Sequence, residues 1–217
     1  MRCVVKALKT VNYRLWFAIL ATMLLPTVYQ TVRIFFLGDM PSDSGINIAS
    51  QLQWVNLFYE VVQEALILPL FFLLGKSLGD RKEFANKVRT GLTATAFVYA
   101  VVSVIIISCA RPLVLFMAQD DSLIDATVTY IRLETIAALF STLWRFMMTV
   151  LVTLKKDKYL YIVLGVQMGL SVLLDTFLVS NLSVSAKLGV NGIAITNITV
   201  NALILICAVF LLQRENI

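Results

Sequence analysis

The sequence predicts an all-α integral membrane protein with six transmembrane helices. Apolar residues make up 59% of the 217 residues and charged residues only 14%, and the mean hydropathy is +0.87. A soluble domain has roughly 45–50% apolar and about 25% charged residues. The apolar residues also gather into runs long enough to cross a bilayer, separated by short charged segments. Lipid is therefore the expected solvent for most of the chain.

Six apolar runs define the expected helices, which form one domain over residues 1–217. Their approximate bounds are 15–37, 51–74, 92–107, 123–154, 159–180 and 190–212. Most contain the roughly 20 residues that a crossing needs. The fourth run is longer than one crossing, so we expect its outer end to project or tilt.

The basic residues outside the runs predict the orientation. Thirteen Lys and Arg lie before the first run, after the second, after the fourth and after the sixth. The opposite loops contain only Arg111 and Lys187, together with several aspartates. Short cytoplasmic loops carry the excess of Lys and Arg. We therefore predict a multi-pass protein of the plasma (inner) membrane with both termini in the cytoplasm.

Several function classes are disfavoured by composition. Histidine is absent, which excludes histidine metal sites and Ser-His-Asp triads. The three cysteines lie far apart without ligand-like spacing. No phosphate-cradling glycine loop is present, and the net charge of +5 comes from loops that set topology rather than from a nucleic-acid surface. We predict no enzymatic activity, no cofactor and no nucleic-acid partner.

Ionisable residues inside the apolar runs indicate a polar interior. A charge at the centre of a lipid-exposed helix costs about 2.5–3.5 kcal/mol, so several such residues cannot all face lipid. They must pair, change protonation state or line a hydrated space. The residues on which this interpretation rests are Arg33, Glu60, Glu64, Glu134, Arg145 and Asp175.

Helical spacing places these residues on shared faces. In the second run, Glu60 and Glu64 belong to a polar stripe with steps of three and four, and in the fourth run Glu134 and Arg145 share a face. We expect Arg145 to pair with Glu60 or Glu64 near the midplane. Two close glutamates away from water tend not to ionise together, so one of them is a candidate proton carrier. The plain alternative is that Arg145 neutralises one of them.

The depth of each residue predicts a second layer. Arg33, Glu134 and Asp175 all lie near the outer ends of their runs, at about 1.5 Å of rise per residue. They could form an outer polar layer. Arg33 also has a plainer interpretation, because it lies close enough to the interface to extend its charged end toward water.

Four segments together resemble the multidrug and toxic compound extrusion (MATE) family. They are Pro26 followed by residues 33–38, the glycine-rich turn at 74–83, Ser171-Val-Leu-Leu-Asp175, and Leu188-Gly-Val-Asn-Gly192-Ile-Ala-Ile-Thr196. The resemblance implies one six-helix lobe of a twelve-helix antiporter, with a second lobe supplied by a missing half or by a homodimer. It also implies export of cationic or amphipathic small molecules in exchange for Na⁺ or H⁺, by rocking of the lobes about a central cleft.

The same resemblance implies site residues. Asp175 and Thr196 would hold the cation, with Na⁺ as one candidate, and Ser171 stands where the family usually has asparagine. Arg33 stands where the family often has an aspartate, so coupling through the usual site is in question. Arg33 could instead neutralise Asp175 and leave an uncoupled or differently coupled carrier.

Two other functions remain open from sequence. A flippase for a lipid-linked or amphipathic substrate would have a larger, more basic cavity that is open to lipid. A non-transporting membrane scaffold would have fully paired intramembrane charges and a closed cavity. Among the six ionisable residues singled out above, four acids against two bases favour cationic cargo, and hence the antiporter.

Overall fold

The computed structural model describes residues 24, 28–35, 44–156 and 158–215, and these residues form a helical bundle without strands. Residues 28–35 are helical. The named elements are α3 (Ser44–Lys76), α4 (Arg81–Phe116), the 3-10 turn η1 (Asp121–Leu123), α5 (Ile124–Thr153), α6 (Lys158–Leu178) and α7 (Val190–Arg214). Five helices in the described part of the chain are long and apolar enough to cross a membrane.

These five helices overlap the second to sixth predicted runs. The first run lies largely outside the described residues, together with Pro26 and Gly38 of the family resemblance. The largest difference in bounds is at α4, which spans Arg81–Phe116 where the apolar run was 92–107. Its first ten residues are mostly polar or charged, so hydropathy alone does not include them. The helix therefore extends beyond the segment that hydropathy assigns to the membrane.

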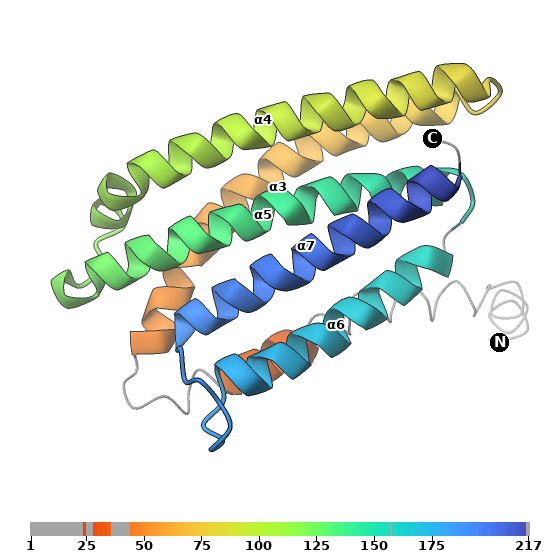
Figure 1. Ribbon diagram of the computed structural model, residues 1–217. Coiled ribbons are helices and arrows are strands. Elements are labelled where there is room, and N and C mark those ends of the chain that lie inside the picture. The colour runs from red at the N-terminus through yellow and green to blue at the C-terminus, as the bar shows by residue number, and fades with distance from the viewer. Residues whose placement is uncertain (1–23, 25–27, 36–43, 157, 216–217) are drawn as a thin grey trace, which may run out of the picture.

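Helix α5 is the centre of the bundle. It packs against α3 and α4 on one side and α7 on the other, while α6 packs mainly against α7 (Figure 1). The buried apolar residues form two clusters near opposite ends of the helices. One includes Ile48, Val128 and Val190, and the other includes Phe84 and Leu212. Because α5 contributes to both clusters, it joins the two ends of the core.

The turn between α3 and α4 is built by side-chain caps. The Ser77 hydroxyl donates to the Leu74 carbonyl at the end of α3, at 3.0 Å. The Asp80 carboxylate then accepts from the backbone N–H groups of Lys82 and Glu83, at 2.8 and 3.2 Å. A carboxylate at this position satisfies backbone donors that have no partner within the helix. Within the charged segment 74–83, the turn itself is thus limited to residues 77–80.

The loop between α6 and α7 folds back onto the end of α6. The Leu188 N–H donates to the Leu178 carbonyl at 2.8 Å. Gly189 then begins α7 with a φ of 61°, in the left-handed region that glycine tolerates best. Three residues later, the backbone of Gly192 passes so close to α6 that an added Cβ would lie 2.9 Å from the Leu178 oxygen. A glycine at 192 is therefore required by packing.

We expect Gly192→Ala to destabilise the bundle by about 1–3 kcal/mol, the usual cost of forcing extra volume into a packed contact. The clash is with backbone, so no side-chain rotation relieves it. Gly169→Ala in α6 is the matched control, because nothing lies within 4 Å of its added Cβ, and it should be neutral or stabilising. Thermal unfolding in detergent measures both, and equal unfolding temperatures for the two variants would contradict the packing argument.

Glu215, at the end of α7, contacts two other segments at one end of the bundle. Its backbone carbonyl accepts from Arg81 Nη2 at 2.6 Å, at the start of α4. Its carboxylate forms an ion pair with Lys156, between α5 and α6. The beginning of α4, the α5–α6 connection and the end of α7 are therefore joined at one point.

Candidate functional site

A buried ion pair joins the segment 28–35 to α6. Asp175 is only 1% exposed, and its Oδ2 lies 3.0 Å from Arg33 Nε while its Oδ1 lies 3.4 Å from Arg33 Nη2. The Tyr29 hydroxyl also donates to Asp175 Oδ2, at 2.8 Å, and the Tyr29 ring lies 4.6 Å from the Arg33 guanidinium carbon. Arg33 thus pairs with Asp175. The alternative that the sequence left open was that Arg33 extends its charged end toward water.

The pair extends to Glu134 through an amide. Arg33 Nη2 donates to Asn197 Oδ1 at 3.0 Å, and Asn197 Nδ2 donates to Glu134 Oε1 at 2.7 Å. Glu134 is 8% exposed. The structure therefore brings the three ionisable residues of the expected outer layer together, with one guanidinium for two carboxylates. We call Arg33, Asp175, Asn197 and Glu134 the charged network.

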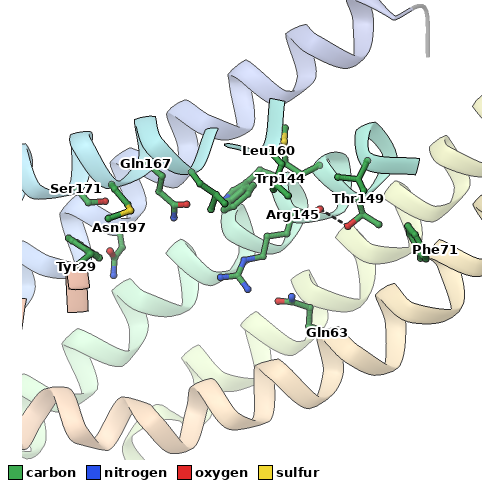
Figure 2. A pocket seen from close by; sticks show the side chains of 14 residues that line it. Tyr29, Gln63, Phe71, Trp144, Arg145, Thr149, Leu160, Gln167, Ser171 and Asn197 are labelled. Carbon is green, nitrogen blue, oxygen red and sulfur yellow. Dashed lines mark hydrogen bonds between the residues drawn. The ribbon is translucent and has the colours of Figure 1, made fainter. Parts of the chain in front are cut away.

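A cavity of about 580 Å³ begins beside this network. Its floor is α5, one wall is α3 and the other is α6 (Figure 2). Residues 28–35 and α7 contribute to the end nearest the charged network. Its lining consists of Tyr29, Gln63, Phe71, Trp144, Arg145, Met148, Thr149, Val152, Leu160, Leu164, Gln167, Met168, Ser171 and Asn197. The volume falls in the range of small-molecule sites, about 300–1,000 Å³.

Among the described residues of this lining, Arg145 is the one side chain that carries a full charge near neutral pH. Its side chain extends from α5 into the cavity, with Gln63 of α3 opposite it (Figure 2). Its guanidinium lies 5.8 Å from the ring of Trp144, and the Trp144 indole N–H donates to Asn201 Oδ1 at 2.9 Å. No carboxylate in the described part of the chain forms an ion pair with it.

The expected pairing of Arg145 with Glu60 or Glu64 is therefore not made. Both glutamates are exposed on α3, and neither lines the cavity, although Gln63 between them does. None of the four ion pairs in the described residues joins Arg145 to Glu60 or Glu64. Of the polar residues on this face of α3, Gln63 thus faces the cavity, whereas Glu60 and Glu64 lie at the surface of the lobe.

The remaining predicted residues are buried. Ser171 is 4% exposed and lines the cavity. Thr196 is fully buried, and its hydroxyl oxygen has no hydrogen-bond partner among the residues that the structure describes. The two oxygens of Asp175 both accept hydrogen bonds from Arg33 or Tyr29. In the described residues there is no group of three Asp, Glu, His or Cys side chains able to hold a metal ion. A Na⁺ site at Asp175 and Thr196 stays a prediction.

Sequence reasoning missed several residues of the site, and most of them are uncharged. Asn197 bridges the network, while Gln63, Gln167 and Trp144 line the cavity. An amide in an apolar run is a weaker signal than a charge, but Asn197 follows Thr196 directly and could have been noted. Arg132 in the fourth run was also left out of the charge argument; it is exposed, and its Nε donates to the Ile107 carbonyl.

These features define a helical membrane lobe with a buried charged network beside a polar cavity. The sequence matches the MatE family over residues 18–177, well over half of the chain. The chain belongs to this family, as the sequence motifs predicted, and it is a multi-pass membrane protein. The family is one of transporters rather than enzymes.

A solved structure supports the same fold. The chain resembles a protein described as "Crystal structure of MATE in complex with MaD3S", with a TM-score of 0.80 and 13% sequence identity. The match covers 89% of this chain and 43% of that one, so the chain spans less than half the length of that transporter. Comparison with curated proteins gave no match. The fold class predicted from sequence, an all-α membrane lobe like that of a MATE transporter, is thus confirmed, and five of its six predicted spans lie in the described part of the chain.

Proposed function

We propose that this chain is one lobe of a secondary active transporter that exchanges amphipathic small molecules for a cation by alternating access. The observation that carries the proposal is the cavity of about 580 Å³ next to the charged network. A scaffold would have paired intramembrane charges and a closed interior, whereas Arg145 faces the cavity without a carboxylate partner among the described residues. A charge is retained in a membrane interior mainly where it serves a pathway or site.

The coupling ion in this proposal is H⁺, and Glu134 carries it. The groups that face Glu134 are Arg33, Asp175, Asn197 and, from its own helix, Tyr130. Arg33 already neutralises Asp175, so within the described part of the chain Glu134 is a buried carboxylate without an ion-pair partner. Burying an uncompensated charge is costly, so an exchangeable cation should accompany Glu134.

A proton fits that place better than Na⁺. Hard metal cations bind several oxygen ligands at once, and the Asp175 oxygens are occupied by Arg33 and Tyr29. A proton needs only one oxygen of Glu134. In this proposal Arg33 is the permanent positive partner of Asp175. The exchangeable cation, a proton, binds to Glu134 instead. This is the differently coupled carrier that the sequence left open.

The cavity lining supports amphipathic cargo. Aromatic and methionine side chains provide apolar surface, and the amides and Arg145 provide polar contacts. The acids that suggested cationic cargo do not line the cavity: Glu60 and Glu64 are at the lobe surface, and Glu134 is buried in the network. The basic cavity is a specific reason to keep the flippase for a lipid-linked substrate as a second candidate.

The proposal includes a second six-helix lobe, either a further part of the same protein or a second copy of this chain. Exposed apolar residues on α3, such as Trp54 and Phe58, suit contact with lipid or with such a lobe. The distribution of Lys and Arg supports the proposal that both termini are cytoplasmic. The proposal places the protein in the plasma membrane.

Vesicles containing the protein as its gene encodes it provide the test. A pair of permanently charged fluorophores, dansyl-taurine and dansylcholine, serves as cargo, because neither redistributes passively with pH. We expect an imposed pH gradient to drive accumulation of at least one probe, and a Na⁺ gradient alone to drive none. Protein-free vesicles and collapse of the gradient by an ionophore are the controls. Accumulation driven by Na⁺ alone, or no gradient-driven accumulation of either probe, would contradict the proposal.

A further inference from the structure

We infer that the cavity binds an anionic amphipath, with its negative group on Arg145 and its apolar body against the apolar lining residues of α6. The inference rests on the proposed function and names its cargo class. It reverses the charge that the count of acids and bases in the sequence favoured. The shared chemistry is one sulfonate, carboxylate or phosphate group on an apolar body, whether free or part of a lipid.

The first argument is the positive charge that Arg145 places in the cavity. Among the described residues, Arg145 is the only one in the lining with a full charge, and no ion pair joins it to Glu60, which is exposed on α3. A cation in this cavity would meet the guanidinium without an opposing carboxylate in the lining. An anion would complete a pair that the lobe itself does not form.

The second argument is the geometry of the donors. A guanidinium presents a planar fork of N–H donors that matches the oxygens of a carboxylate, sulfonate or phosphate. The amides of Gln63 and Gln167 face the cavity from α3 and α6, on either side of Arg145 (Figure 2). Their N–H₂ groups can donate to the same anion. Donors from three helices therefore converge on one region.

The third argument is the apolar wall of the cavity. Leu160, Leu164 and Met168 of α6 line the cavity and are partly exposed, and Phe71 of α3 is 43% exposed. Trp144 and Met148 also belong to the lining but are only 3% and 2% exposed, so they offer a ligand little surface. Methionine side chains adapt to varied shapes. The cavity thus combines one strong anion contact with an adaptable apolar wall, which suits an amphipath better than a small inorganic anion.

Binding of the two dansyl probes tests the charge preference directly. The full chain in nanodiscs of zwitterionic lipid is titrated against each probe, and the fluorescence anisotropy gives its affinity. We expect dansyl-taurine to bind more tightly than dansylcholine. Arg145→Gln should weaken dansyl-taurine about ten- to a hundredfold, as for loss of a charge-assisted contact, and Arg145→Glu should reverse the preference.

Two further variants distinguish anion binding by Arg145 from effects on folding and from effects of the protein's overall charge. Arg132→Gln changes an exposed arginine of the same helix that does not line the cavity, and should leave both affinities unchanged. Arg145→Lys keeps the charge but loses the fork, so it should bind dansyl-taurine with intermediate affinity. Equal affinities in the original protein and Arg145→Gln, or equal losses in Arg145→Gln and Arg132→Gln, would overturn the inference.

Competition identifies the source of the anion. Displacement of dansyl-taurine by octyl sulfate, but not by phosphatidylglycerol placed in the nanodisc, assigns a free amphipath. Displacement by phosphatidylglycerol assigns a lipid, and displacement by neither would overturn the inference. Failure of the vesicle experiment with this binding intact would refute transport alone. Transport driven by the pH gradient without anion preference would refute the anion site alone.

Discussion

Asp175→Asn is expected to destabilise the protein by about 3–5 kcal/mol, because it leaves the Arg33 guanidinium in the bundle without its carboxylate. The variant should still insert, since insertion follows the hydropathy of the helices, but it should lose gradient-driven transport. The double variant Arg33→Gln with Asp175→Asn removes both charges and should recover most of the stability. Unfolding in detergent and vesicle transport are the two measurements.

The exposed pair of Arg111 and Asp125 is the matched control. Its atoms lie 2.8 Å apart, but its side chains are 62% and 86% exposed. Exposed pairs contribute about 0–1 kcal/mol, so Asp125→Asn should change little. If Asp175→Asn were no less stable than Asp125→Asn, the buried pair would not hold the lobe together. If the double variant were stable but unable to couple transport to a proton gradient, Asp175 itself would belong to the coupling step.

Glu134→Gln is expected to abolish coupling while leaving exchange of cargo intact. Glutamine can still accept the hydrogen bond from Asn197 but cannot carry a proton. One proton per cargo and one unit of pH difference support up to about a tenfold accumulation, and the variant should reduce this ratio to about one. The measurement is the steady-state probe ratio across vesicles with the membrane potential held at zero.

Glu64→Gln provides the comparison for that experiment. Glu64 is exposed and outside the cavity lining, so its replacement should leave the accumulation ratio unchanged. It also tests the idea, drawn from the spacing of Glu60 and Glu64, that this pair carries the proton. Full accumulation in Glu134→Gln, together with loss of accumulation in Glu64→Gln, would show that the proton carrier lies on α3 and is not Glu134.

The fold class was predictable because it depends on composition along the chain. Apolar runs of sufficient length predict helices in a membrane, and the turn at residues 74–83 is a local signal of glycine and charge. The extent of α4 was not predictable in the same way, since its polar first turns are stabilised by the Asp80 cap and by neighbours rather than by hydropathy.

The site was predictable only in part, because helical spacing shows which residues share a face but not what that face meets. Arg33, Glu134 and Asp175 had similar depths, and they do lie together. Glu60 and Glu64 share a stripe, yet the rotation of α3 leaves them exposed. That rotation is set by contacts with α4 and α5, which involve apolar residues far apart in sequence.

The contacts of Glu215 and of Arg33 lie at opposite ends of the bundle, and together they limit how this lobe can deform. At one end, the termini of α4 and α7 and the α5–α6 connection are bound to one residue. At the other, α5, α6, α7 and residues 28–35 are joined by the charged network. Helices α5, α6 and α7 take part in both sets of contacts, so we expect them to move together as one unit. In the proposed two-lobe transporter, the hinge is then expected at the boundary between the lobes.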